Sequence, residues 1–186
     1  MKPDFSDGRV LGLVVILAAI GVAALVASDP RTVPSSGAKT AHTHPEMDHS
    51  SPEAQRRMAI YHYNEGNQHL KAGQWTRAVD QYAMALAHNT ELPQVYLNLS
   101  TALLKQKKFK EALSRLRRLE QLAPDLPELH YNLACYFALT GNLEEGVQAL
   151  ENAFRKGYNN RADLDADPDL EALRPLPRFK QLCHGG

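Results

Sequence analysis

The strongest constraint on the fold of this chain is a spacing of 34 residues that recurs between residues 59 and 158. Small and large residues keep separate columns at this spacing: Asn64, Asn98 and Asn132; Gly66, Ser100 and Ala134; Ala78, Ala112 and Gly146; Tyr82, Leu116 and Leu150. Small residues let helices approach closely, and large residues fill the facing gaps. A fixed period of this kind predicts an all-α array of three stacked helix–turn–helix units.

Proline and glycine divide the array into six helices, because proline suits a first helical turn and glycine a helix end. Gly73, Gly141 and Gly157 are the predicted glycine stops, and Pro52 and Pro127 lie in predicted first turns. The predicted helices cover residues 52–72, 76–89, 92–106, 109–122, 127–140 and 143–156.

The period and its residue pattern resemble the tetratricopeptide repeat. Each first helix carries small–x–x–large, each second helix carries Ala-x-x-x-Tyr/Leu-x-x-Ala/Leu or a close variant, and Pro124 stands where that family usually has proline. The resemblance implies three repeats within residues 52–158, at about 59–92, 93–126 and 127–160, that form a short superhelix. Because function on such arrays depends on surface residues, the period indicates the fold and leaves the function open.

In this family the first helices of successive repeats line a concave groove that binds a protein segment. The tyrosines and leucines there would offer apolar contact, and the asparagines could pair with a peptide backbone. The resemblance places these residues in the groove: Tyr63, Asn67, Leu70, Lys71, Leu97, Asn98, Thr101, Leu104, Lys105, Glu128, Tyr131, Asn132, Cys135 and Leu139.

A carboxylate clamp of the kind found in chaperone-associated repeats is not expected. Asn67 and Asn98 match its asparagines, but Tyr63, Glu128 and Asn132 stand where the clamp has cations. Without those cations, a terminal carboxylate pair would lose its charge-assisted partners.

The N-terminal segment predicts a membrane anchor. After a tail at residues 1–9, residues 10–27 form an uncharged apolar run of 18 residues. At about 1.5 Å per residue the run reaches roughly 27 Å, close to the thickness of a hydrocarbon core. We therefore expect a transmembrane helix or signal anchor at residues 10–28, with the repeats on the periplasmic or extracytoplasmic side; a cleaved signal peptide is the alternative.

Residues 29–51 predict a flexible linker, because they contain Pro, Ser, Thr, Gly and His and almost no large apolar residue. His42, His44 and His49 lie near Met47 and nearby carboxylates, a set that could hold copper or zinc loosely. A solvated spacer is the simpler interpretation, so no metal site is predicted.

Residues 159–186 predict a C-terminal cap and tail. The last repeat of such an array would otherwise leave an apolar face in water. Two short helices are expected at residues 169–174 and 177–182, and the alternating acidic run from Asp163 to Glu171 is interpreted as part of the cap. The apolar residues sized for this covering role are Leu164, Leu170, Leu173, Leu176, Phe179 and Leu182.

The composition and motifs argue against several functions. Lys+Arg 21 balances Asp+Glu 21, so no global charge favours nucleic acid. The chain has no phosphate-binding glycine loop and no nucleophile elbow, and we expect neither catalysis nor a cofactor. Cys135 and Cys183 fit no metal-ligand spacing, and a disulfide between them is unsupported. His62 and His69 are expected to be packing residues.

The basic residues of the middle hairpin predict a solvated face, with docking to an acidic partner or to anionic lipid headgroups as the alternative. They are Lys105, Lys107, Lys108, Lys110, Arg115, Arg117 and Arg118.

Together these features predict a membrane-anchored scaffold or adaptor of bacterial envelope type. It would hold a protein segment in its groove during assembly of an envelope complex. A metal-handling accessory protein that uses the histidine linker and a self-assembling homo-oligomer are the alternatives.

Overall fold

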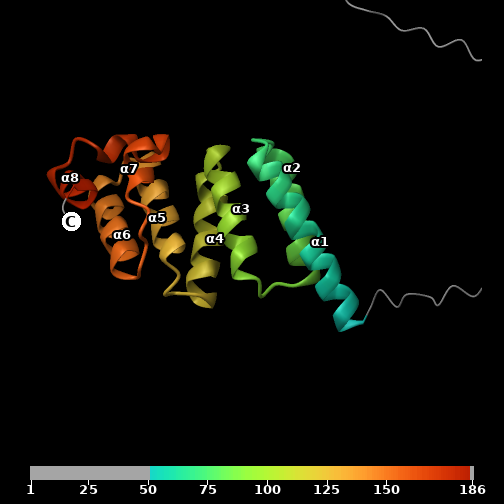
Figure 1. Ribbon diagram of the computed structural model, residues 1–186. Helices are drawn as coiled ribbons and strands as arrows, with labels where there is room; N and C mark the ends of the chain where they lie inside the picture. Colours follow the sequence, from blue (N-terminus) through green and yellow to red (C-terminus); the bar gives the residue numbers. More distant parts are fainter. Residues whose placement is uncertain (1–50, 185–186) are drawn as a thin grey trace, which may run out of the picture. The chain divides into compact units, whose positions relative to one another are not determined.

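The computed structural model describes residues 51–184, in which three helical hairpins are followed by a group of shorter helices (Figure 1). Each end of the six long helices lies within one residue of its predicted position, which confirms the all-α repeat array. The elements are α1 (Pro52–Lys71), α2 (Trp75–His88), α3 (Pro93–Lys105), α4 (Phe109–Leu122), α5 (Pro127–Leu139), α6 (Leu143–Arg155), α7 (Ala162–Ala166), the 3-10 helix η1 (Pro168–Leu173) and α8 (Pro177–His184).

The hairpins pack in the order of the chain. Helix α1 packs against α2, α3 against α4, and α5 against α6, while α2–α3 and α4–α5 contacts join successive hairpins. The first helices α1, α3 and α5 also contact one another in that order. We call the surface that these three helices share the first-helix face.

The recurring columns of the sequence form the core. Ala78 and Ala112 are fully buried beside Tyr82, Leu116 and Leu150, which are also fully buried. The small residue at position 66 has a direct steric reason, since a Cβ on Gly66 would lie 2.5 Å from Cε1 of Tyr82. That close approach explains why a glycine in α1 faces a tyrosine in α2.

The turn inside each hairpin needs a left-handed backbone. Gly73 and Gly141 supply it with φ of 69° and 81°, whereas the middle hairpin places Lys107 at φ 58°. A left-handed conformation costs a residue with a side chain roughly 1 kcal/mol or more. The middle hairpin is therefore strained at a position where the other two are not.

The C-terminal segment caps the last hairpin, as predicted. Leu164, Leu170, Leu173 and Phe179 are buried, and η1 packs against both α5 and α6. The short helix expected at residues 169–174 is a 3-10 helix at Pro168–Leu173, and α7 was not expected. Asp167 caps η1, because its side chain accepts a hydrogen bond from the Asp169 backbone N–H, and Pro168 follows in the first turn.

The predicted tail at 1–9, the anchor at 10–28 and residues 29–50 of the predicted linker lie outside the described residues. Between residues 51 and 184, no helix combines the length and the apolar character that crossing a membrane requires. The anchor therefore stays a prediction.

Candidate functional site

The first-helix face carries the predicted groove residues, and two of them take part in an amide network. The Asn67 side-chain oxygen accepts hydrogen bonds from the Tyr82 hydroxyl and from the Asn98 amide, both at 2.8 Å. The Asn98 amide thus joins α3 to α1, where the sequence predicted a contact with a partner backbone. This network fixes the relative position of the first two repeats on the side that the groove would occupy.

Three of the predicted groove residues are buried: Leu104, Asn132 and Cys135. The Asn132 amide donates to Thr101 Oγ1 at 2.9 Å and lies 3.2 Å from Ser100 Oγ, so it fastens α5 to α3. The Asn132 side chain thus faces the neighbouring first helix, and the Cys135 thiol faces Asp167 of the C-terminal segment.

The C-terminal part of the first-helix face is filled by the chain's own acidic turn. Asp169 accepts a hydrogen bond from the Lys105 ammonium at 2.7 Å, and Asp167 Oδ1 lies 3.9 Å from the same nitrogen. The Tyr131 hydroxyl donates to Asp167 Oδ2 at 2.6 Å, and the ring of Tyr131 stacks on Tyr158 with centroids 4.7 Å apart. We call Lys105, Tyr131, Cys135, Asp167 and Asp169 the closed half of the face.

The surroundings of two residues in the closed half raise their pKa values. Burial lowers the pKa of Lys105, but the hydrogen bond to Asp169 and the nearby carboxylates outweigh it, so the pKa is raised overall. Burial raises the pKa of Tyr131, and its hydrogen bond to Asp167 raises it further. At neutral pH the closed half therefore holds a charged lysine and a neutral tyrosine against two aspartates.

The closed half also brings three metal-binding groups together. One ligand atom each from Cys135, Asp167 and Asp169 lies within 4.8 Å of the other two. However, burial and then the carboxylates hold the pKa of the Cys135 thiol well above its usual range, which disfavours the thiolate that a metal needs. The Lys105 ammonium already supplies a cation to the carboxylates, so the arrangement works as an ion-pair contact between the cap and the repeats.

The N-terminal part of the face stays open. A hollow of about 270 Å³ lies between α1 and the start of α3, and its lining is largely apolar with two amides at its edge. Ile60, which is 49% exposed, belongs to this lining. We call the hollow and its lining the open half; its residues are Ile60, Tyr63, Asn64, Leu92, Gln94 and Val95.

The remaining predicted groove residues differ in exposure. Lys71 and Glu128 are exposed, whereas Leu70, Leu97 and Leu139 are half-buried. Of the predicted groove residues, Tyr63 is the one that lines the hollow of the open half. Sequence reasoning missed Ile60 and Gln94, which share a repeat position with the predicted groove residue Glu128 but differ from it in residue type. It used the repeated Asn64 to find the period without assigning it to the surface. It missed the role of Asp167 and Asp169 because it assigned the acidic run to the cap alone.

The histidines of the first hairpin pack as predicted. His62 is half-buried, bonds Gln81 at 2.8 Å and stacks parallel to His88, with ring centroids 5.6 Å apart. His69 is also half-buried and bonds Gln74 at 2.7 Å. Cys135 and Cys183 are both free thiols. The linker histidines lie outside the described residues.

Part of the array matches a known repeat family. Residues 69–134 match the tetratricopeptide repeat family model. A chloroplast protein of Arabidopsis thaliana is 35% identical over 81 residues, which are 42% of this chain and 24% of that protein. The matched part thus spans only about a quarter of that relative.

Solved structures show the same fold. The first repeat domain of Spaghetti (RPAP3), bound to the HSP90 peptide SRMEEVD, is 20% identical with a TM-score of 0.55, and the match covers 68% of this chain and 93% of that one. The TPR2B domain of yeast Sti1 in complex with an Hsp70 peptide is 18% identical with a TM-score of 0.53, and the match covers 67% and 98%. Residues 69–134 therefore match the tetratricopeptide repeat, and the described helices have the fold of a tetratricopeptide-type array.

Proposed function

We infer that this chain is a non-catalytic adaptor that captures a protein segment on the open half of its first-helix face. The observation that carries this function is the contrast on that face: one half is filled by the chain's own aspartates, and the other leaves an apolar hollow open. Interface centres are typically apolar with a few hydrogen-bonding groups at the rim, and the hollow has this composition.

The hollow favours a segment that inserts one apolar side chain. Ile60, Leu92 and Val95 supply the apolar lining, while the amides of Asn64 and Gln94 can pair with the backbone on either side. The structural relatives support a peptide-binding role, because two of them were solved with a bound chaperone peptide. The clamp cations are replaced by other residue types in this chain, so the proposed segment need not end in a carboxylate pair.

The proposed setting is a bacterial envelope. Residues 10–27 would anchor the chain as a single span, and residues 29–51 would tether the repeats on the periplasmic or extracytoplasmic side. The adaptor would then hold its partner beside the membrane during assembly of an envelope complex. The support for this setting is the apolar run and the linker composition in the sequence.

The test compares changes in the lining of the open half with a change at a similarly exposed apolar residue outside it. A photo-crosslinking amino acid at Asn64 in the full chain should trap one discrete partner in membranes. Ile60→Ser with Tyr63→Ala should lower that yield about tenfold or more, since truncating a residue at an interface centre often costs about 2 kcal/mol. Met84→Ser on α2 is the control, because Met84 is 46% exposed and Ile60 is 49% exposed. Equal yields from all three proteins would exclude the open half as the binding site.

A further inference from the structure

Helix α4 carries a second surface that the capture of a segment on the first-helix face does not use. Its buried side consists of Ala112, Leu116 and Leu119, which are all fully buried. Positions three, four, seven and eight apart share one side of a helix, and six residues form such a stripe away from the buried side. The stripe exposes Lys110, Ser114, Arg117 and Gln121, with half-buried Leu113 and Arg118 beside them. We call this stripe the basic face.

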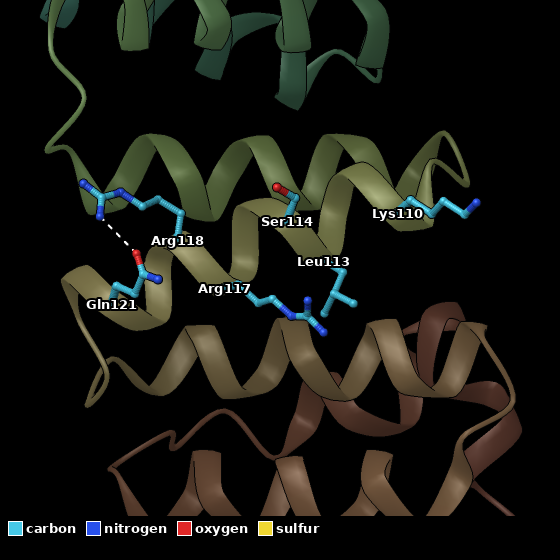
Figure 2. Close-up of a pocket in the computed structure, with 6 residues that line it drawn as sticks. All are labelled: Lys110, Leu113, Ser114, Arg117, Arg118 and Gln121. Atoms are coloured by element: carbon cyan, nitrogen blue, oxygen red, sulfur yellow. Dashed lines mark hydrogen bonds between the residues drawn. The ribbon is translucent and has the colours of Figure 1, made fainter.

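The stripe is hollowed. The six residues line a recess of about 240 Å³ on α4. Figure 2 shows Lys110 at one end of the stripe, and Arg118 with Gln121 at the other end. Arg118 Nη1 donates a hydrogen bond of 3.1 Å to Gln121 Oε1. Guanidinium, ammonium, hydroxyl and amide groups are therefore spaced along the stripe, and they can donate hydrogen bonds to several oxyanions in a row.

The cations of the basic face lack acidic partners in the described part of the chain. Among the carboxylates whose side chains the structure describes, none lies within 4.0 Å of Lys110, Arg117 or Arg118. Elsewhere on the surface, by contrast, Arg178 pairs with Glu144 at 3.0 Å and with Glu151 at 2.7 Å. The charge of the basic face is therefore available to an external anion.

We propose that the basic face docks an acidic segment of a partner protein, whose carboxylates lie along the stripe from Lys110 to the two arginines. Charge complementarity identifies the partner, because arginine forks match carboxylates in geometry and the recess offers neutral donors beside them. An anionic membrane fits less well. The exposed large apolar residues of the described chain are Ile60, Tyr61 and Met84 on α1 and α2, so the basic face has no exposed large apolar side chain to insert among acyl chains.

The test uses the full chain in non-ionic detergent and a fluorescent helical peptide as long as the stripe, with glutamates three and four residues apart. The same peptide with glutamine at every glutamate is the neutral probe. We expect the acidic peptide to bind and the neutral peptide not to, with affinity falling as salt rises. Lys110→Glu, Arg117→Glu and Arg118→Glu together should weaken binding at least about tenfold, because three attractions become repulsions.

A matched control makes the same total change of charge at three cations on other helices. Arg56→Glu, Arg155→Glu and Lys180→Glu alter three exposed cations on α1, α6 and α8 by the same total charge. This control should leave peptide binding within about twofold, because exposed charges beyond a screening length interact weakly. Circular dichroism melting of both variants checks that the fold is kept, and the milder Lys110→Gln, Arg117→Gln and Arg118→Gln set replaces the reversal if it does not.

Three results would overturn the proposal. The first is equal loss of binding in both charge-reversed sets, and the second is no peptide binding at all. The third is binding to phosphatidylglycerol vesicles, lost in the α4 variant, without binding to the acidic peptide. That last result would assign the basic face to a membrane. All three are independent of the capture test at Asn64, so the two functions can fail separately.

Discussion

The two halves of the first-helix face are built from the same repeat but meet different surroundings. In the open half, α1 and α3 leave a hollow lined by Ile60, Tyr63 and Val95. In the closed half, the acidic turn at the start of η1 covers the equivalent surface of α5, and its two aspartates reach Tyr131 and Lys105. The comparison teaches that a repeat period determines which residues form the core, while the segment after the last repeat decides how much of the binding face remains available.

Apolar contact, more than charge, holds the closed half shut. Leu170 and Leu173 of η1 are both fully buried, and burying a leucine side chain stabilises by about 1.5–3 kcal/mol. An ion pair that water still reaches is worth about 1 kcal/mol or less. The leucines therefore attach the segment, and the Lys105–Asp169 pair positions its acidic turn.

The largest expected effect tests this attachment. Leu173→Ala should lower the free energy of unfolding by about 2–5 kcal/mol, because it removes a fully buried side chain and leaves a cavity. Leu97→Ala in α3 should cost clearly less, because Leu97 is only half-buried. Urea denaturation followed by circular dichroism measures both. Equal losses would show that the cap is no better anchored than the rest of the face.

The second prediction compares close contacts on the two sides of the array. Gly66→Ala should destabilise by roughly 1–3 kcal/mol, since its Cβ would meet the Tyr82 ring at 2.5 Å. Gly146→Ala should cost less, because its nearest neighbours are Leu173 methyl groups at 3.0 and 3.2 Å, which can move. The melting midpoints of the two variants give the order, and the reverse order would contradict this account of the packing.

The third prediction opens the closed half without removing its leucines. Cys135 is buried beside Asp167, so its alkylation rate reports on exposure beneath the acidic turn. In a Cys183→Ser background, Lys105→Met should speed alkylation by at most about fivefold, because the ion pair that it removes contributes about 1 kcal/mol or less. Lys108→Met changes an exposed lysine of the same hairpin and serves as the control. An unchanged rate in Lys105→Met would mean that the leucines alone close this half.

The smallest effect concerns alkaline pH. The folded pKa values of Lys105 and Tyr131 are raised from 10.5 and 10.0, so above about pH 10 the unfolded chain loses these protons first. Their contribution to stability is therefore complete below that pH and falls as the pH rises further. Tyr131→Phe should weaken this alkaline loss, as measured by urea denaturation from about pH 8 to about pH 11. A steeper loss in the variant would contradict the sign of the effect.

The sequence by itself determined the array and most of its core. Columns of small and large residues set 34 residues apart predicted the six helices, because helix packing requires a small residue wherever a large one approaches, as at Gly66 and Tyr82. The covering role of Leu170 and Leu173 was also predictable, since a terminal repeat cannot leave its apolar side in water.

Only the tertiary structure decided which part of the binding face stays open. Lys105 and Asp169 are 64 residues apart and belong to no common pattern, so nothing local indicates that they meet. The same holds for Tyr131 and Asp167, whose contact depends on the path of the chain through α7 and η1. A periodic pattern records the contacts that every repeat makes, whereas this contact is made once, by a segment outside the period, and is therefore decided by how that segment packs.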